Sequence, residues 1–364
     1  MINKNIVFFM PSIEGGGVEK NLFIVSNYFS KKFKNVTLIT SSSKFKSKFN
    51  KQIKIISPNN FFWESFGRRA KYFVCLFLLV IQFFKNKEII VFSFQANIYC
   101  IILCKIFNVK IIVRSNTAPI GWSKNIFKRS IFKIFLNLSD KVMVNSLQFK
   151  KDLKKEFSVN ADCIYNPLNT KEIIKKSKIK SKKIFKNKTL KIINVGRFTE
   201  QKDQITLLKA LNEIKNQLNF EAFIIGRGVL KQKLKNYIQQ NNLSKVIKLK
   251  NFSKNPFPLI KQSDIFILSS CYEGLPNVLL ESLVLKKFVI SSNCKTGPNE
   301  ILLNGRGGFL FKVGNYKQLS KLIIKYYFNK KDCSKKLKES INQLKRFDYE
   351  TNLKKYLNLI NSIN

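Results

Sequence analysis

Two carboxylates eight positions apart, Glu273 and Glu281, lie in the part of the chain best equipped for chemistry, DIFILSSCYEGLPNVLLESLVLKKFVISSNCKTG (264–297). The apolar run at 265–269 predicts a buried strand. Pro276 suits the first turn of a following helix, because its fixed φ is helical and its missing N–H would be unpaired there. The amides that follow would point out of a helix start, where the macrodipole is positive. We therefore predict an anionic ligand at this helix start, with hydroxylated groups beside it.

Two cations, Arg197 and Lys202, follow another predicted strand in the segment NVGRFTEQKD (194–203). Gly196 permits a tight turn at the strand end, so both cations can reach one anion. A guanidinium fork and a compact ammonium together suit a diphosphate. Because the chain holds 67 Lys and Arg residues, two cations alone mean little, and it is their place at a strand end that favours a ligand.

Two glycine turns, Gly15–Gly17 and Gly226–Gly228, also follow predicted strands. Glycine would let the backbone approach a ligand closely there, although each run could equally be a plain tight turn. Two more strands of the first half end in polar residues, Gln95 after one and Arg114 with Asn116 after the other. Since neighbouring parallel strands end at one edge of a sheet, these side chains are expected to face a common ligand site.

The cysteine, histidine and carboxylate content argues against metal and redox chemistry. The seven cysteines are scattered without a CxxC pair, and the chain has no His, so neither a zinc site nor a disulfide framework is predicted. A reducing cytoplasm fits this pattern. The seven Asp residues are isolated, whereas a divalent metal usually needs clustered carboxylates, so we expect a metal-independent site.

Length and net charge limit the number of domains and the kinds of binding partner. A chain of 364 residues exceeds what one hydrophobic core usually supports, so two domains are expected. The net charge of +46 has two explanations that stay open, a low-GC coding bias and a basic surface for anionic lipid. A nucleic-acid binder is a third explanation, but no recognition module supports it and the basic residues are spread out.

The apolar run 72–84 (YFVCLFLLVIQFF) could be a buried helix, an interfacial membrane helix or a membrane span. Thirteen helical residues rise about 20 Å, short of the ~30 Å hydrocarbon core, which disfavours a span. Lys and Arg residues flank the run on both sides, so the interfacial alternative stays open beside the buried one. The N-terminus has an apolar run of only five residues and is interpreted as a first strand instead of a signal peptide.

Strand-like and helix-like runs alternate twice along the chain, which predicts two doubly wound α/β domains with a ligand cleft at the carboxyl ends of their strands. The expected parts are a first Rossmann-like domain at 1–167, a Lys-rich linker at 168–189, a second Rossmann-like domain at 190–345, and a C-terminal helix at 346–364 that could pack back on the first domain. The helices expected in the first domain lie at 18–29, 66–85, 97–107 and 123–137.

The segment EGLPNVLLE resembles the E-x7-E motif of the GT-B retaining glycosyltransferases often called family four. The segments GGGVE, VGRFTEQKD and TGPNEIL occur in the order and at roughly the spacing that this family shows, so the resemblance covers almost the whole chain. The sequence around TGPNEIL and around Arg114 is most similar to that of bacterial members that add a hexose or N-acetylhexosamine to lipid-linked oligosaccharides or surface polysaccharides. The resemblance implies a GT-B fold, a UDP-sugar or GDP-sugar donor, no cofactor, and a cytoplasmic enzyme peripheral on the inner face of the membrane.

The resemblance also implies residue roles. The implied catalytic residues are Glu273, which would bind the hydroxyls of the transferred sugar, and Arg197 and Lys202, which would hold the donor diphosphate. The other implied donor-binding residues are Gly16 and Gly17 from the first domain, Gly196, Gly226 and Arg227 beside the nucleobase, Gly274, Leu275, Asn277 and Val278 at the diphosphate, and Glu281 on the ribose.

Relatives are thought to react on one face of the sugar, with the leaving phosphate taking the acceptor proton in an ion-pair-like transition state. Catalysis would then rest on positioning and on stabilising charge at the leaving diphosphate. Many relatives place a His of the first domain against the donor sugar, and this chain has none. Arg114, Asn116 or Gln95 could take its place.

The leading hypothesis is thus a glycosyltransferase with a nucleotide-sugar donor and a lipid-linked saccharide acceptor, resting on anionic membrane through its basic first domain and the aromatic cluster at 61–63. The alternatives are a nucleotide-sugar epimerase on the same fold, an inactive binding protein on that fold, and the nucleic-acid binder. No nucleic-acid partner is expected.

Overall fold

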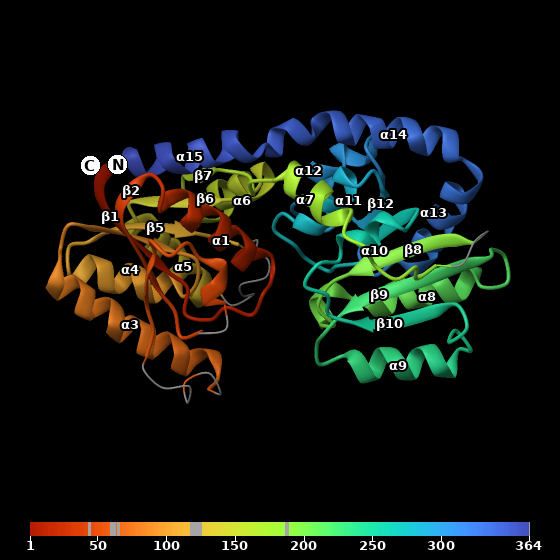
Figure 1. The fold of residues 1–364 in the computed structure, drawn as a ribbon, viewed down its shortest axis with the longest axis horizontal. Coiled ribbons are helices and arrows are strands. Elements are labelled where there is room, and N and C mark those ends of the chain that lie inside the picture. The colour runs from red at the N-terminus through yellow and green to blue at the C-terminus, as the bar shows by residue number, and fades with distance from the viewer. Residues whose placement is uncertain (43–44, 59–62, 64–65, 117–125, 186–188, 364) are drawn as a thin grey trace. The chain divides into compact units, whose positions relative to one another are not determined.

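The computed structural model describes residues 1–42, 45–58, 63, 66–116, 126–185 and 189–363 (Figure 1). The chain divides into two compact units. Unit 1 comprises Met1–Pro167 and Glu350–Asn364, and unit 2 comprises Leu168–Tyr349.

In the described part of unit 1, seven parallel strands form one sheet in the order β3-β2-β1-β4-β5-β6-β7. Phe8 of β1 pairs with Leu38 of β2 on one side and Phe92 of β4 on the other. The chain therefore builds the sheet outward from β1 twice, which is the doubly wound order. The strands span Ile2–Phe9 (β1), Phe33–Ile39 (β2), Lys54–Ile56 (β3), Ile89–Ser93 (β4), Lys110–Arg114 (β5), Lys141–Val144 (β6) and Ala161–Cys163 (β7).

Helices cover both faces of this sheet, which is why its strands are continuous apolar runs. Val7, Phe9 and Val91 point into a core shared with α3, α4, α5 and α6. Phe8 and Phe92 point to the other face, where Phe29 of α1 and Tyr356 of α15 pack on them. The helices span Gly17–Phe29 (α1), Arg68–Lys85 (α3), Asn97–Ile106 (α4), Ile126–Leu138 (α5), Leu147–Phe157 (α6) and Tyr349–Asn361 (α15), with a short 3₁₀ helix at Lys46–Lys48 (η1).

In the described part of unit 2, six parallel strands form a second sheet in the order β10-β9-β8-β11-β12-β13. β8 lies between β9 and β11, and Ile192 of β8 pairs with Ala222 and Ile265. The strands span Leu190–Val195 (β8), Phe220–Gly226 (β9), Ile247–Asn251 (β10), Ile265–Leu268 (β11), Phe288–Ser292 (β12) and Phe309–Phe311 (β13).

The helices of unit 2 again pack on the sheet. Ile265 and Ile267 of β11 face a core built with α8, α9 and α13. On the opposite side, α11 contacts β11 and β12, and α7 contacts α10 and α11. The helices span Thr170–Ser177 (α7), Gln204–Ile214 (α8), Lys231–Gln240 (α9), Phe257–Lys261 (α10), Asn277–Val284 (α11), Pro298–Ile301 (α12), Tyr316–Phe328 (α13) and Lys330–Asn342 (α14), with 3₁₀ helices at Glu200–Lys202 (η3), Leu303–Gly305 (η4) and Gln343–Phe347 (η5).

Two parts of the chain differ from the sequence prediction. Helix α6 was not expected, because its sequence LQFKKDLKKEF is mostly charged, yet Phe149, Leu153 and Phe157 form a buried stripe at helical spacing. The Lys-rich segment 168–189, predicted as a linker, contains α7, whose start is capped by the Asn169 side chain accepting from the amide of Glu172. Within the described residues, every helix is too short or too polar to cross a bilayer.

Candidate functional site

The candidate site of unit 2 lies where β8 and β11 end side by side. The chain leaves β8 toward β9 on one side, and β11 occupies the other side, so this is the point where the strand order reverses. Open α/β sheets bind ligands outside the carboxyl ends of the strands at such a point. Lys202 follows β8 and Glu273 follows β11, so the sheet brings together two predicted residues that are far apart in the sequence.

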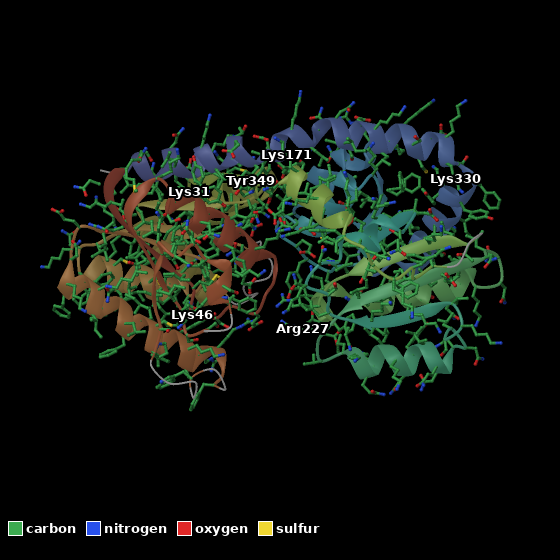
Figure 2. All side chains as sticks on the ribbon, viewed as in Figure 1. Lys31, Lys46, Lys171, Arg227, Lys330 and Tyr349 are labelled. Carbon is green, nitrogen blue, oxygen red and sulfur yellow. The ribbon has the colours of Figure 1, made fainter. Side chains whose placement is uncertain are left out.

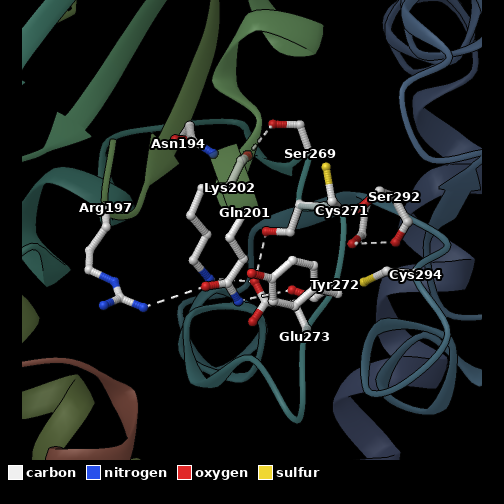
Figure 3. A network of polar contacts seen from close by, with 12 residues as sticks. Asn194, Arg197, Gln201, Lys202, Ser269, Cys271, Tyr272, Glu273, Ser292 and Cys294 are labelled. Carbon is white, nitrogen blue, oxygen red and sulfur yellow. Dashed lines mark hydrogen bonds and ion pairs between the residues drawn. The ribbon is translucent and has the colours of Figure 1, made fainter. Parts of the chain in front are cut away.

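Lys202 and Glu273 form an ion pair that is largely shielded from solvent (Figure 3). The ammonium contacts Oε1 of Glu273, and the Ser270 hydroxyl donates to the same oxygen at 2.7 Å. The two charged side chains are only 15% and 8% exposed. Because the pair is neutral as a whole, it can stay buried while keeping hydrogen-bonding groups at the end of the strand.

Hydrogen bonds join the segment around η3 to the loop that carries Glu273 (Figure 3). The amide of Cys271 donates to the carbonyl of Gln201 at 2.8 Å, and the Gln201 side chain donates to the carbonyl of Tyr272 at 3.0 Å. The hydroxyl of Ser269 donates to the carbonyl of Lys202 at 3.0 Å. The loops that carry the two members of the ion pair are thus joined by one backbone–backbone and two side chain–backbone hydrogen bonds, which holds the pair together.

The loop after β12 supports Glu273 from the other side. The Ser292 hydroxyl donates to the carbonyl of Ser270 at 2.6 Å, and the Thr296 hydroxyl donates to the carbonyl of Glu273. Gly297 has φ +84°, and a Cβ there would lie 2.0 Å from the carbonyl oxygen of Gly274, so only glycine fits. The loop with Gly274, one of the predicted donor-binding residues, is therefore fixed by close backbone packing.

Gln201, Ser270, Ser292 and Thr296 were missed by the sequence reasoning. Their signal is weak, since hydroxyl and amide side chains are common at the ends of strands. The paired serines at 269–270 and 291–292 do form a repeated pattern at the ends of β11 and β12, which are neighbours in the sheet. That pattern gains meaning only once the two strands are known to be adjacent.

Helix α11 begins next to Glu273, as predicted, with Pro276 at the N-cap position instead of within the first turn. Its N-cap residue, Pro276, makes no side-chain cap hydrogen bond, and its first turn has no acidic residue. Leu275 is buried, while Asn277 and Val278 are half-buried. Glu281 is buried one turn further along α11. The helix thus presents its positive end beside the ion pair, an arrangement suited to an anion.

Arg197 is exposed and reaches the Gln201 side chain at 3.5 Å. The turn after β8 packs tightly on the turn after β9, since a Cβ on Gly226 would lie 1.9 Å from the carbonyl oxygen of Gly196. Backbone packing therefore explains the glycine at position 226 without a ligand.

Arg227 is exposed, and its guanidinium lies 4.7 Å from the ring centre of Phe252, which is also exposed. The two side chains form a flat surface at the carboxyl end of β9.

Two cysteines near the ion pair are unsuited to nucleophilic chemistry. Burial, together with the nearby Glu273 carboxylate, raises the pKa of the Cys294 thiol to about 12. Burial also raises the pKa of Cys271, with added repulsion from Asp203 and Glu200. Both thiols are protonated at neutral pH, and the thiolate is the reactive form. Among the described residues, no group of three or more His, Cys, Asp or Glu side chains is placed to hold a metal ion.

In unit 1, the predicted residues gather at the carboxyl ends of β1, β4 and β5. Gly16 precedes α1 and Gly17 begins it, and a Cβ on Gly16 would lie 2.8 Å from Oε2 of Glu19. The buried Glu19 carboxylate accepts from the amide of Glu14 at 3.3 Å. Gln95 accepts from the amide of Ser12 at 3.1 Å, so the loops after β1 and β4 are joined.

Arg114 and Asn116 bond to groups of unit 1. Arg114 is 1% exposed, donates to Oδ1 of Asn166 at 2.8 Å and stacks on Phe94 at 5.1 Å. Asn116 donates to the carbonyl of Phe94 at 3.0 Å. A side chain as buried as Arg114 meets the core of its unit, so this placement gives its predicted substrate contact no support. For Gln95 and Asn116 a substrate contact stays a prediction. Of the aromatic cluster at 61–63, only Trp63 lies within the described residues.

Sequence comparison identifies relatives of this chain. The family described as "Glycosyl transferases group 1" matches residues 175–345. An uncharacterized glycosyltransferase of Methanocaldococcus jannaschii is 31% identical over 331 residues, covering 78% of this chain and 81% of that protein. An N-acetylgalactosamine-N,N'-diacetylbacillosaminyl-diphospho-undecaprenol 4-alpha-N-acetylgalactosaminyltransferase of Campylobacter jejuni is 28% identical over 230 residues, which is 60% of each chain and less than two thirds of that relative.

Solved structures share the fold at low sequence identity. Anabaena HepE in complex with UDP-glucose superimposes with a TM-score of 0.78 at 16% identity, covering 99% of this chain and 100% of that chain. Sucrose-phosphate synthase of Thermosynechococcus elongatus gives a TM-score of 0.81 at 14% identity and covers 99% of both. With two doubly wound parallel α/β units, the predicted GT-B fold class is confirmed.

Proposed function

The chain belongs to the family of glycosyl transferases group 1, and we propose that it is a retaining, metal-independent member that uses a nucleotide sugar. It moves a hexose or an N-acetylhexosamine to a lipid-linked or polysaccharide acceptor at the cytoplasmic face of the membrane. The observation that carries this proposal is the buried Lys202–Glu273 pair beside the positive start of α11. An anion and a hydroxylated sugar can both be bound there.

The chemistry follows from the charges at this place. The bond between the anomeric carbon and the donor phosphate breaks, a bond from that carbon to the acceptor oxygen forms, and the acceptor proton passes to the leaving phosphate. Negative charge grows on the diphosphate, where Arg197, Lys202 and the helix start stabilise it. Glu273 holds sugar hydroxyls, and Glu281 holds the ribose. No side chain has to act as a general base.

The donor and acceptor classes are supported by relatives. The HepE complex holds UDP-glucose, so UDP-sugars come first among donors. The name of the Campylobacter relative includes diphospho-undecaprenol, which favours a lipid-linked acceptor here. A lipid-linked acceptor in turn requires that the protein work at a membrane surface. The Arg227–Phe252 surface at the end of β9 is where we place the nucleobase, since a flat ring can stack on it.

A panel of nucleotide sugars tests the proposal by thermal shift and by nucleotide release. A UDP-sugar or GDP-sugar at about 100 times its Kd should stabilise the protein by about 2.7 kcal/mol. The accepted donor should be turned over by the wild-type protein, and Lys202→Ala and Glu273→Ala should each abolish turnover. Retention is read from the anomeric configuration of the product by NMR.

Glu172→Ala and Lys176→Ala are matched controls, because these residues form an exposed i, i+4 pair of the same types on α7 of the same unit. Both controls should keep full turnover. Unchanged turnover in Lys202→Ala and Glu273→Ala would reject the site assignment. Absence of a thermal shift with every nucleotide sugar would reject the function.

A further inference from the structure

Helix α3 has two apolar faces. Cys75, Leu79 and Phe83 point into the core of unit 1. On the outer face, Phe73, Phe77 and Phe84 are between 67% and 75% exposed. Positions i, i+4 and i+11 of a helix lie on one side, so these rings form a single stripe. The outer side chains of α3 point away from the unit in Figure 2. The apolar run at 72–84 is therefore a core helix with a second, solvent-facing apolar stripe.

Helix α5 repeats this arrangement. Phe127, Ile131, Ile134 and Leu138 are between 46% and 77% exposed and lie at i, i+4, i+7 and i+11. Between the two helices, α4 packs on both and contributes Tyr99 and Ile106. These nine side chains are called here the outer apolar face of α3–α5. Figure 1 shows the three helices together on the side of the sheet away from α15.

A bias in composition does not explain this face. In unit 2, the large apolar side chains that are exposed lie on separate helices, turns and loops, as Val229, Phe252 and Phe328 illustrate. In unit 1, nine fall on three neighbouring helices at helical spacing. A contiguous exposed apolar surface of this kind marks an interaction site.

Charge identifies the partner. Helices α3, α4 and α5 contain no carboxylate, although Arg68, Lys105 and Arg129 pair with Glu14, Asp140 and Glu156 of neighbouring segments. Arg69 and Lys85 are exposed at the two ends of α3. Helix α6, which packs on the same side of the sheet, exposes Lys150, Lys151, Lys154 and Lys155. Apolar rings bordered by cations suit the interface of an anionic bilayer. A second copy of this face would bring like charges together, which disfavours self-association.

We propose that the outer apolar face of α3–α5 docks unit 1 on an anionic lipid surface, with the α6 lysines at the level of the headgroups. The helices lie in the plane of the interface, since none of those described could span the bilayer. This inference rests on the proposed function, because docking brings the protein to a lipid-linked acceptor. It adds the surface that makes the contact and the lipid charge that the surface selects.

Vesicle binding tests the apolar part. Purified protein is sedimented with vesicles of phosphatidylcholine alone and of phosphatidylcholine mixed with phosphatidylglycerol. The wild type should bind the mixed vesicles at least tenfold better. Phe77→Asp and Ile134→Asp should each lower the partition coefficient by about tenfold or more, since each removes an apolar side chain that the bilayer would bury. Phe328→Asp is the matched control, because this α13 ring in unit 2 is 71% exposed, and it should change nothing.

Neutralising lysines tests the electrostatic part. Lys150→Gln and Lys154→Gln should each weaken binding to the mixed vesicles about fivefold at low salt. Their difference from the wild type should vanish at ~1 M salt, where the Debye length falls to about 3 Å. Lys321→Gln, an exposed lysine of α13 in unit 2, is the control. Circular dichroism melts should be unchanged for all of these surface variants.

The outcomes separate this inference from the proposed function. Equal binding of the wild type to both kinds of vesicle, or equal binding by wild type, Phe77→Asp and Ile134→Asp, would overturn the docking surface. Self-association that these variants disrupt, without vesicle binding, would overturn it in favour of a second copy. The wild type could bind vesicles, lose this binding in the variants, and yet turn over no nucleotide sugar. That result would support the docking surface and reject the proposed function. Release of nucleotide without vesicles should be unaffected by Phe77→Asp.

Discussion

Breaking the buried pair of unit 2 should have a much larger effect than breaking an exposed pair of the same residue types. Lys202 and Glu273 are 15% and 8% exposed, whereas Lys176 and Glu172 are both 46% exposed. Lys202→Met leaves the Glu273 carboxylate buried with the Ser270 hydroxyl, and Glu273→Gln leaves the ammonium beside a neutral amide. Removing one partner of a buried pair costs about 3–5 kcal/mol, because the remaining charge stays desolvated without compensation.

The double variant Lys202→Met/Glu273→Gln contains no uncompensated charge, so its loss should be smaller than the sum of the two single losses. We expect a coupling free energy of about 2–3 kcal/mol for this pair. The corresponding cycle on Glu172 and Lys176 should give about 0.3–0.5 kcal/mol. Urea denaturation followed by circular dichroism measures both cycles, provided that the m-value is unchanged.

A coupling near 0.5 kcal/mol or below for Lys202 and Glu273 would refute the reasoning, because it would mean that solvent screens the pair as well as it screens the α7 pair. A double variant whose loss of stability equals the sum of the two single losses would refute it as well, because the coupling would then be zero. The cycle does not depend on activity, so it tests the electrostatics of the site even where no donor is known.

The remaining predictions concern single positions. Gly226→Ala should lower the free energy of unfolding by about 2 kcal/mol or more, since its Cβ would meet a carbonyl at 1.9 Å, whereas Gly196→Ala, whose nearest atoms lie at 3.6 Å, should fold normally; urea titrations compare them. The pKa of Cys294 is raised from 9.0 to about 12 in the fold, so its stabilising effect is full below pH 9 and is lost as pH rises toward 12. Cys294→Ala should flatten this alkaline loss of stability by up to about 1.4 kcal/mol per pH unit. Asn166→Ala should destabilise unit 1 by about 1–3 kcal/mol, because it removes an acceptor from the buried Arg114 guanidinium, and a thermal melt detects this.

The alternation of strands and helices could be predicted because buried parallel strands are continuous apolar runs and leave a strong signal. The principle that ligand groups follow strand ends then placed Lys202 and Glu273 at one edge of a sheet. That the two side chains pair with each other depends on β8 lying next to β11, and strand order is a property of the whole fold. The family resemblance implied separate roles for the two residues, at the diphosphate and at the sugar hydroxyls, and did not imply that they pair.

Side-chain direction at a strand end was beyond the sequence. Arg114 is the last residue of β5, and polarity favoured a ligand-facing position, yet its guanidinium is buried on Phe94 and Asn166. Helix α6 escaped prediction for a related reason. Its apolar stripe of Phe149, Leu153 and Phe157 is narrow, and the lysines between them dominate the composition of the segment. Tertiary packing decides such cases, since burial of a few side chains outweighs the local preference.

The location of the carboxylates decides what the net charge of +46 means. Lysines are spread over both units. The total charge therefore does not distinguish a low-GC coding bias from a basic surface for anionic lipid. On α3, α4 and α5 three cations pair with carboxylates of neighbouring segments, namely Arg68 with Glu14, Lys105 with Asp140 and Arg129 with Glu156. The exposed Arg69 and Lys85 of α3 and the four exposed lysines of α6 still leave cations in excess on this side, while in unit 2 Lys202 is matched by Glu273. An unbalanced face attracts a surface of opposite charge, and a balanced buried pair holds a fixed geometry. The same excess of lysine can therefore serve docking in one unit and leave the chemistry of the other to a few paired residues.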